Sequence, residues 1–434
     1  MQTSRHTERV NRTRVIVLPP NEQSRDKYDL VNRDASYHGR VVPCSAEPCG
    51  CELTNNLLDT TSGGECRILR RLYGAVIAVL SCARNQPLRM GAAMKRMICL
   101  ALLFLLAVVS TSAADDLFDI KPMADGVYAA LAKPVYKINC NAAIILFDDS
   151  VLVVDTHSKP SAARALIEQV KRLTDKPVKY VVNTHFHWDH YQGNQAYPSS
   201  WPAGVEIISS EATRLNIEER GIPRVKHEIT TMPADIEKLK ADVAAATDPA
   251  QKAKLSSDLA QAQDYLSELK TMQVTLPTLT FDHSLILHRR SRTVEMFWLG
   301  NAHTNGDVFV YLPKEKILIT GDAMHGWTPF MGDSYPYDWI TTLDEAEKLD
   351  FDQVLGGHGD VMHGKERFEL WKQYFTDLMA ETAKAYANGA TLDQAQEQVS
   401  KILIPKYSAK FDPAFPHDMI PNVTKAYQVI AFPK

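Results

Sequence analysis

The residues from Asn183 to His190 read Asn-Thr-His-Phe-His-Trp-Asp-His and follow directly after an apolar, strand-like run at 178–182. Neutral imidazoles and carboxylates are the ligands that zinc and related divalent cations select. At the end of a strand such ligands are aimed by a rigid sheet, while the following loop leaves room for a substrate. A single histidine is usually a packed or surface residue, but four ligand-type residues in H-x-H-x-D-H spacing predict a metal site. These four are His185, His187, Asp189 and His190.

Three further ligand-type residues, each at or just beyond the end of an apolar run, occur later in the chain. They are His303, Asp322 and His358. Nearby glycines let the backbone turn sharply where a strand ends. The blocks and their order resemble the metallo-β-lactamase superfamily, and the similarity covers roughly residues 125 to 375.

The resemblance implies two metal positions and assigns ligands to each. His185, His187 and His303 match the ligands of the first zinc ion, and Asp189, His190 and His358 match those of the second. Asp322 matches a carboxylate that bridges both ions in the glyoxalase-like and lactonase-like branches. The implied cofactor is two zinc ions, with iron or manganese as alternatives because a bridging carboxylate suits harder metals. True zinc β-lactamases carry Cys or Ser at the position of Asp322, which weakens the case for β-lactam hydrolysis without excluding it.

The expected chemistry is hydrolysis by a metal-activated water. Two cations that share a water lower its pKa from about 15.7 to about 7, and the resulting hydroxide can attack a polarised carbonyl. We expect Asp189 to contribute to catalysis as a ligand of the second metal ion. Cys140 is expected to be a small buried residue rather than a nucleophile. Asp155, at the end of another apolar run, is expected either to orient a ligating imidazole or to cap a helix.

These features predict a secreted or periplasmic dinuclear zinc hydrolase that opens an ester, lactone, thioester or amide bond in a small molecule. A β-lactamase acting on antibiotics is an alternative. A mononuclear-iron oxidoreductase of the persulfide-dioxygenase type is another, although those relatives use only two histidines and one aspartate. A metal-stabilised binding protein without turnover is a third. Export also argues against glutathione-linked substrates.

A signal-peptide pattern lies at residues 94–113, with a basic start, about a dozen apolar residues and a small-residue cleavage site. The apolar run is shorter than the about 20 residues of a membrane span. We therefore expect residues 1–93 to be an over-called gene start or a disordered extension. The hydrolase domain would then comprise residues 114–434, with no stable membrane anchor. The alternative is a genuine extension in which the apolar run anchors the chain in a membrane.

Cysteine usage and charge exclude some classes. Six of the seven cysteines precede residue 100, so cleavage after Ala113 would leave Cys140 alone and permit no intrachain disulfide. The spacing of Cys44, Cys49 and Cys51 matches no common zinc pattern. The net charge of −4 offers no basic surface for nucleic acid.

Strand and helix patterns alternate in two halves. Alternating or short apolar runs predict strands near 126–131, 142–147, 151–154, 178–182, 205–208, 279–287, 293–299, 307–312 and 316–320. Helices are predicted near 161–173, 341–349 and 365–387. The resemblance implies an α/β fold, the four-layer αββα sandwich, with the metals at one sheet edge. Composition alone would indicate only a mixed α and β domain.

Residues 211–277 do not fit the common core, because they are polar and have helical periodicity. Two antiparallel helices are predicted over about 234–270, linked at Asp248-Pro249, where an N-cap precedes a first-turn proline. Leucines of the second helix, including Leu255 and Leu269, form a stripe expected to be buried. This helical hairpin is interpreted as packing on its own body, as a lid over the metals, or as a homodimer contact.

An aromatic-rich segment follows Asp322 at residues 324–339. It is interpreted either as an apolar wall for the substrate or as a loop packed down by its own aromatics. Trp327 and Phe330, with Trp188 of the first motif, are the candidate substrate contacts. His325 and His363 lie near ligands in the sequence, but the family pattern does not require them.

Overall fold

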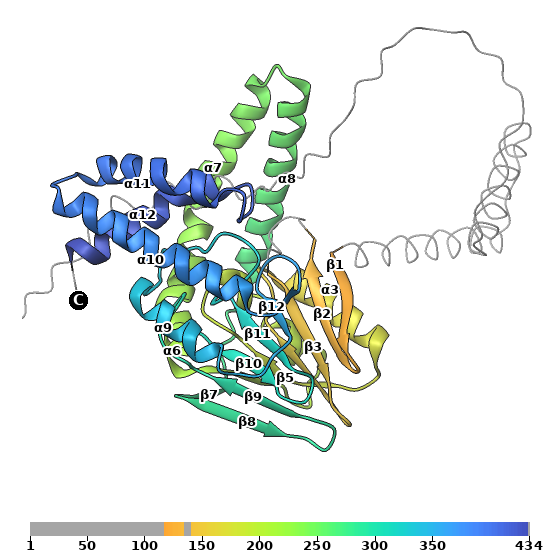
Figure 1. Ribbon diagram of the computed structural model, residues 1–434. Coiled ribbons are helices and arrows are strands. Elements are labelled where there is room, and N and C mark those ends of the chain that lie inside the picture. The colour runs from red at the N-terminus through yellow and green to blue at the C-terminus, as the bar shows by residue number, and fades with distance from the viewer. Residues whose placement is uncertain (1–116, 134–139, 433–434) are drawn as a thin grey trace, which may run out of the picture. The chain divides into compact units, whose positions relative to one another are not determined.

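In the computed structural model, which describes residues 117–133 and 140–432, two β-sheets face each other (Figure 1). The first sheet has the spatial order β1 (Phe118–Ala124), β2 (Val127–Ala132), β3 (Ala142–Leu146), β4 (Val151–Val154), β5 (Val178–Val182), β6 (Glu206–Ser210), β7 (Leu279–Phe281). The second has the order β13 (Met362–His363), β12 (Gln353–Gly356), β11 (Ile317–Gly321), β10 (Phe309–Leu312), β9 (Thr293–Phe297), β8 (Ser284–His288). Strands β4 to β7 are parallel, as are β11 and β12.

Helices cover the outer faces of both sheets and complete four layers. An aliphatic core that includes Ile145, Val154 and Ile319 fills the space between the sheets. Helix α3 (Pro160–Leu173) packs its Ala- and Leu-rich face on the first sheet. Helices α9 (Pro336–Ala346) and α10 (Glu366–Ala387) pack on the second. The predicted αββα sandwich is therefore confirmed.

Two C-terminal helices that the sequence pattern did not predict pack against α10. They are α11 (Leu392–Tyr407) and α12 (Phe415–Ala431). Their aromatic residues Tyr407 and Phe415 are fully buried in the same core as α9 and α10. A capping box between Thr391 and Gln394 begins α11, so the sequence did contain a signal for this helix.

The inserted segment forms a helical hairpin, as predicted. The short helices α4 (Trp188–Tyr191) and α5 (Ala196–Ser200) lie before β6, and the inserted segment itself begins with α6 (Glu211–Asn216) and the π-helix η3 (Ile217–Gly221). The hairpin is α7 (Ile222–Ala245) and α8 (Pro249–Thr271), and Figure 1 shows them side by side. The Asp248 side chain accepts a hydrogen bond of 2.7 Å from the Gln251 N–H, which is the expected N-cap.

The hairpin is buried only at its base. Leu266 and Leu269 pack against α7, whereas Leu255 and Leu259 are only half-buried. The leucine stripe was expected to be buried against either α7 or another subunit: α7 buries its basal part, and burial of the distal part against another subunit stays a prediction. Helix α7 also begins earlier than predicted, since Pro223 in its first turn is compatible with a helix.

The strand predicted at 279–287 and the helix predicted at 341–349 differ from the structure. The strand predicted at 279–287 is two strands, because the chain leaves β6 of the first sheet and pairs with β9 of the second between Phe281 and Ser284. Helix α9 begins at Pro336, five residues earlier than predicted, because proline fits the first turn of a helix.

The predicted signal peptide and the residues before it lie outside the described ranges. Within those ranges, no helix is both long and apolar enough to cross a membrane.

Candidate metal centre

Seven histidine and aspartate side chains meet where strands of both sheets end. His185 and His187 follow β5, Asp189 and His190 lie on α4, and the remaining three follow β9, β11 and β12. They form two groups in which the candidate ligand atoms lie within 4.8 Å of one another. The first group is His185, His187, His303 and Asp322, and the second is Asp189, His190 and His358. The structure therefore brings together all seven residues that the sequence singled out.

Asp322 lies between the two groups. Its Oδ1 is 3.4 Å from His190 Nε2, and its Oδ2 is 3.2 Å from His358 Nε2. The same Oδ2 is 3.7 Å from Nε2 of His303, which belongs to the first group. One carboxylate thus faces ligand atoms of both groups, as a bridging ligand must.

Several of these atoms are buried without a hydrogen-bond partner. They are His185 Nε2, His190 Nε2 and Asp322 Oδ1. An unpaired buried polar atom costs about 1–3 kcal/mol, so a cluster of them aimed at one space needs a compensating partner. Divalent cations satisfy imidazole and carboxylate lone pairs together. The side chains present therefore fit two metal ions.

The protein holds the other ring nitrogen of three candidate ligands, His187, His190 and His303. Asp155 Oδ2 accepts from His190 Nδ1 at 2.7 Å, and the Phe330 carbonyl accepts from His303 Nδ1 at 3.0 Å. His187 donates from Nε2 to Asp333 Oδ2 at 3.0 Å. Such bonds fix the ring orientation and tautomer, so that the opposite nitrogen presents its lone pair to the cluster.

Asp155 orients a ligand and does not cap a helix. It also accepts from the Thr184 N–H and hydroxyl, each at 2.8 Å, and so holds the first residue of the motif loop. Helix α3 begins at Pro160 with Lys159 at its N-cap, so the capping alternative was wrong. Asp155 has φ 63°, a strained backbone for a non-glycine residue that such multiple bonds can maintain.

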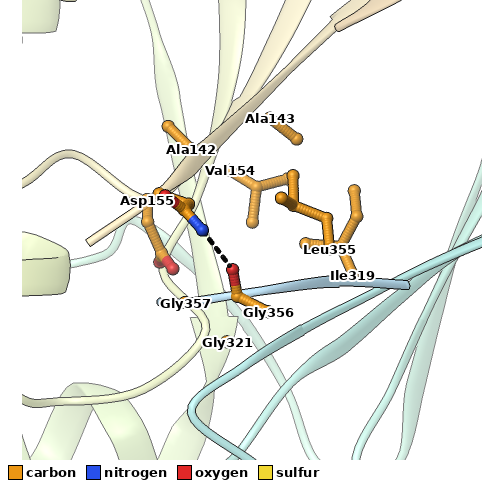
Figure 2. Close-up of a pocket in the computed structure, with 10 residues that line it drawn as sticks. Ala142, Ala143, Val154, Asp155, Ile319, Gly321, Leu355, Gly356 and Gly357 are labelled. Carbon is orange, nitrogen blue, oxygen red and sulfur yellow. Dashed lines mark hydrogen bonds between the residues drawn. The ribbon is translucent and has the colours of Figure 1, made fainter. Parts of the chain in front are cut away.

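The strand ends beneath the cluster approach closely. Figure 2 shows Asp155 beside Gly356 and Gly357, and the dashed bond joins the Asn141 amide to the Gly356 carbonyl at 3.0 Å. A Cβ on Gly357 would lie 2.1 Å from Asp322 Oδ1, so only glycine leaves room for that carboxylate.

Burial and charge set the protonation of the cluster. Burial lowers the pKa of His185 well below its usual range and that of His303 to about 3, so both rings are neutral at pH 7. Burial alone would lower the pKa of His190, but Asp155, Asp189 and Asp322 together raise it. Burial would raise the pKa of Asp322, but His358 and His190 hold it well below its usual range. Ionised Asp322 and the neutral rings of His185 and His303 favour a bound cation, which would displace the proton that the carboxylates favour on His190.

The three candidate substrate contacts lie in different surroundings. Trp327 stacks on His358 with ring centroids 4.9 Å apart, and Phe330 lies 5.8 Å from the His187 ring. Both belong to what we term the aromatic loop, residues 324–335 between β11 and α9. Trp188 instead packs against the hairpin, with its ring 6.1 Å from that of Tyr265.

Other residues discussed from the sequence lie beside the cluster. Cys140 is fully buried, and its Sγ is 3.3 Å from His157 Nδ1. Burial raises the pKa of its thiol, which disfavours a nucleophilic thiolate. His325 packs between the rings of His358 and Trp371 and belongs to neither ligand group.

Sequence reasoning missed Asp333 and its partner Arg220. The Arg220 guanidinium bonds Asp333 Oδ1 and lies 4.3 Å above the Phe186 ring. Burial would raise the pKa of Asp333, but His187 and Arg220 lower it. Asp333 is 146 positions from His187, so no local pattern could have linked them.

Comparison with known proteins identifies the class of protein to which the chain belongs. A family model described as the metallo-beta-lactamase superfamily matches residues 135–358, just over half of the chain. The chain belongs to this superfamily, and its two groups of ligand-type side chains could hold metal ions.

Individual relatives are more distant. The linear primary-alkylsulfatase of Pseudomonas sp. (strain ATCC 19151) is 24% identical over 284 residues, which cover 61% of this chain and 50% of that protein. The chain therefore spans about half the length of this curated relative. A metallo-beta-lactamase from Pontibacter korlensis has a TM-score of 0.44 and 16% identity, covering 60% of this chain and 99% of that one. The mono-zinc form of the metallo-beta-lactamase FIM-1 from Pseudomonas aeruginosa has a TM-score of 0.43 and 19% identity, covering 60% and 95%.

Proposed function

We propose that this chain is a dinuclear metal hydrolase that cleaves an ester-type bond of a small molecule. The observation that carries the proposal is the position of Asp322, whose two oxygens face ligand atoms of both groups. His185, His187 and His303 would hold one ion, Asp189, His190 and His358 the other, and Asp322 both. Two bound ions supply an activated water and polarise the scissile bond.

The residues around the ligands support such a role by fixing geometry. Asp155, Asp333 and the Phe330 carbonyl each hold one imidazole from its far side. This arrangement lets the ligands accept cations without reorganisation. Trp327 and Phe330 beside the ligand rings suit an apolar substrate group.

For the bond itself, carboxylic esters and lactones are our first candidates, with thioesters and amides next. Sulfate esters are a second candidate, favoured by the similarity to a linear primary-alkylsulfatase over 284 residues. Hydrolysis of either kind of ester releases an alkoxide or a sulfate as the leaving group. A nearby cation stabilises the negative charge that develops on this group. A β-lactamase remains an alternative, weakened by the aspartate at position 322. A mononuclear-iron oxidoreductase is weakened by the two complete ligand groups.

Zinc is the proposed metal, and iron and manganese are the alternatives. Metal analysis of the purified chain, combined with a panel of chromogenic substrates, tests the proposal directly. The panel contains a carboxylic ester, a lactone, a β-lactam and a primary alkyl sulfate. Two metals per chain with hydrolysis that Asp189→Ala reduces by orders of magnitude would support it. One iron per chain with oxygen uptake, or two metals with no hydrolysis, would contradict it.

Export and self-association complete the proposal. The pattern at residues 94–113 supports a cleaved signal and a periplasmic or secreted enzyme starting near Ala114 or Asp115. N-terminal sequencing of exported protein tests this, and an intact protease-resistant segment before Met94 would contradict it. The exposed distal hairpin supports a homodimer contact.

A further inference from the structure

The aromatic loop beside the ligand cluster is held in part by the C-terminal helices and the turn between α11 and α12. These helices, α10 to α12, lie outside residues 135–358 that match the family model. They nevertheless share a buried core with the loop, since Met324 and Met331 pack in the same cluster as Tyr374 and Phe415. The family-type sandwich alone therefore does not determine where this loop lies.

Backbone groups along the loop bond side chains of the C-terminal segment. Arg367 donates to the carbonyls of His325 at 3.4 Å and Trp327 at 3.0 Å, and also to Gly326. The guanidinium is itself fixed, because it donates to the Lys410 carbonyl at 2.8 Å and lies 4.8 Å from the Phe411 ring.

Asp412, between α11 and α12, holds the centre of the loop. Its Oδ1 accepts from both the N–H and the hydroxyl of Thr328 at 2.6 Å, and its Oδ2 accepts from the Ala414 N–H at 3.1 Å. Thr328 is buried, and in the sequence it lies between Trp327 and Phe330. A carboxylate that binds this single residue therefore sets the positions of the aromatic side chains on both sides of it.

Asn422, on α12, holds the next residue. It is 1% exposed and donates from Nδ2 to the Pro329 carbonyl and to the Tyr374 hydroxyl, both at 3.0 Å. The following carbonyl, that of Phe330, accepts from Nδ1 of the candidate ligand His303. A chain of contacts thus runs from α12 through the loop to the ligand cluster.

We infer that Asp412 and Asn422 are positioning residues that fix the substrate-facing wall formed by Trp327 and Phe330 and, through the Phe330 carbonyl, the orientation of His303. The part of the inference that concerns the substrate-facing wall rests on the proposed function. It assigns to the C-terminal helices a role in substrate selection, for substrates with a long apolar group.

Two variants and a matched control test this inference on the full, metal-loaded chain. Asp412→Ala and Asn422→Ala each remove bonds to the loop. Thr424→Ala, on α12 like Asn422, removes the bonds to Gln396 (2.8 Å) and to the Ile420 carbonyl (2.9 Å), neither of which involves the loop. For each, kcat/KM is measured with a short-chain and a long-chain ester of 4-nitrophenol, or with a short and a long primary alkyl sulfate if the sulfate ester is the substrate.

The preference for the long-chain substrate should fall about tenfold in both variants, as expected for lost positioning bonds, and stay unchanged in Thr424→Ala. Asp412→Asn keeps an acceptor for Thr328 and should retain most of the wild-type preference. If Asp412→Ala does not fold, Thr328→Val on the loop removes the hydroxyl bond alone and should shift the preference in the same direction. An unchanged preference in the folded variants would overturn the wall assignment.

A chelator competition that needs no turnover tests the His303 part separately. Both alanine variants should bind metal about tenfold more weakly, because the carbonyl that orients His303 is displaced. Wild-type metal affinity in both variants would overturn this part. A wild-type chain that binds metal but hydrolyses none of the panel contradicts the proposed function, and the competition result still decides on the positioning role.

Discussion

His187 Nε2 lies 3.0 Å from Asp333 Oδ2, and His187 Nδ1 lies 2.8 Å from Nε2 of His303. The two nitrogens of the His187 ring therefore have different partners and different roles. Nε2 is engaged by a carboxylate on the aromatic loop, which leaves Nδ1 to point into the ligand cluster. Arg220 holds the far oxygen of Asp333, so the orientation of one candidate ligand depends on a residue next to the hairpin.

Asp333→Ala should weaken metal binding by about 10- to 100-fold, because the ring of His187 would lose the partner that fixes its tautomer. Competition with a chromogenic chelator measures this without reference to turnover. Asp350→Ala is the control, because it also removes one carboxylate, from an exposed pair with Lys316. Equal metal affinity in the two variants would show that Asp333 does not support the ligand.

The ligand set could be predicted from the sequence because each ligand is marked by residues that are close to it in the chain. His185 to His190 occupy one loop, and each later ligand follows a recognisable apolar strand. The supports could not be found in the same way, since Asp333 and the Phe330 carbonyl act on residues 146 and 27 positions away, respectively. Asp155 was recognised only as one of two alternatives, because both a helix cap and a ligand partner occur at a strand end.

The elements were predicted best where periodicity was strong. Fully buried β4, with its Val-Leu-Val-Val sequence, matched its predicted bounds, as a strand covered on both faces should. The change of sheet between Phe281 and Ser284 does not break the strand periodicity, because the alternation of apolar residues at 279 and 281 resumes in the same phase at 285 and 287 after the polar residues between. The spacing of the hairpin leucines predicts one apolar face but not how deeply each residue is covered, and in the distal half Leu255 and Leu259 are only half-buried.

Gly357→Ala should displace the carboxylate between the two ligand groups. The new Cβ would lie 2.1 Å from Asp322 Oδ1 and 2.9 Å from His190 Cε1, and neither buried group can move freely. We expect less than two metals per chain and a loss of about 1–3 kcal/mol in unfolding free energy. Elemental analysis and chemical denaturation measure the two effects. Gly204→Ala, with nothing within 4 Å of its Cβ, is the control for metal content only, because its φ of 119° disfavours alanine and affects stability by itself; full metal occupancy in Gly357→Ala would refute the steric argument.

Asp307 should make stability depend on pH. Burial raises its pKa to about 6, although the Thr304 N–H and hydroxyl donate to it. A raised folded-state pKa means that the folded chain holds the proton more tightly than the unfolded chain. The contribution of protonated Asp307 to the free energy of unfolding is therefore fully present below about pH 4. It is lost as the pH rises through about 6, and the total loss is roughly 3 kcal/mol.

Asp307→Asn removes this titration and keeps an acceptor for one of the two Thr304 donors, while its amide nitrogen can donate to the Thr304 hydroxyl oxygen. Denaturant unfolding at pH 4 and pH 7, on chelator-treated protein so that metal occupancy does not change with pH, measures the effect. The variant should gain stability relative to the wild type as pH rises. A stability difference between variant and wild type that is the same at both pH values would contradict the assignment.

Shortening the hairpin separates its base from its tip. None of residues 240–254 is buried, whereas Tyr265 at the base donates to Gln192, next to α4, at 2.8 Å. Replacing 240–254 with a short Gly/Ser linker should leave metal content unchanged and kcat within about twofold, because an exposed tip contributes little to the local structure of the site. Light scattering should show the mass falling from two copies to one if the tip is a homodimer contact. Tyr265→Phe is the matched change at the base, and we expect it to cost about 1 kcal/mol of stability through the lost bond to Gln192. A changed substrate range in the shortened chain, without a change in mass, would instead make the hairpin a lid.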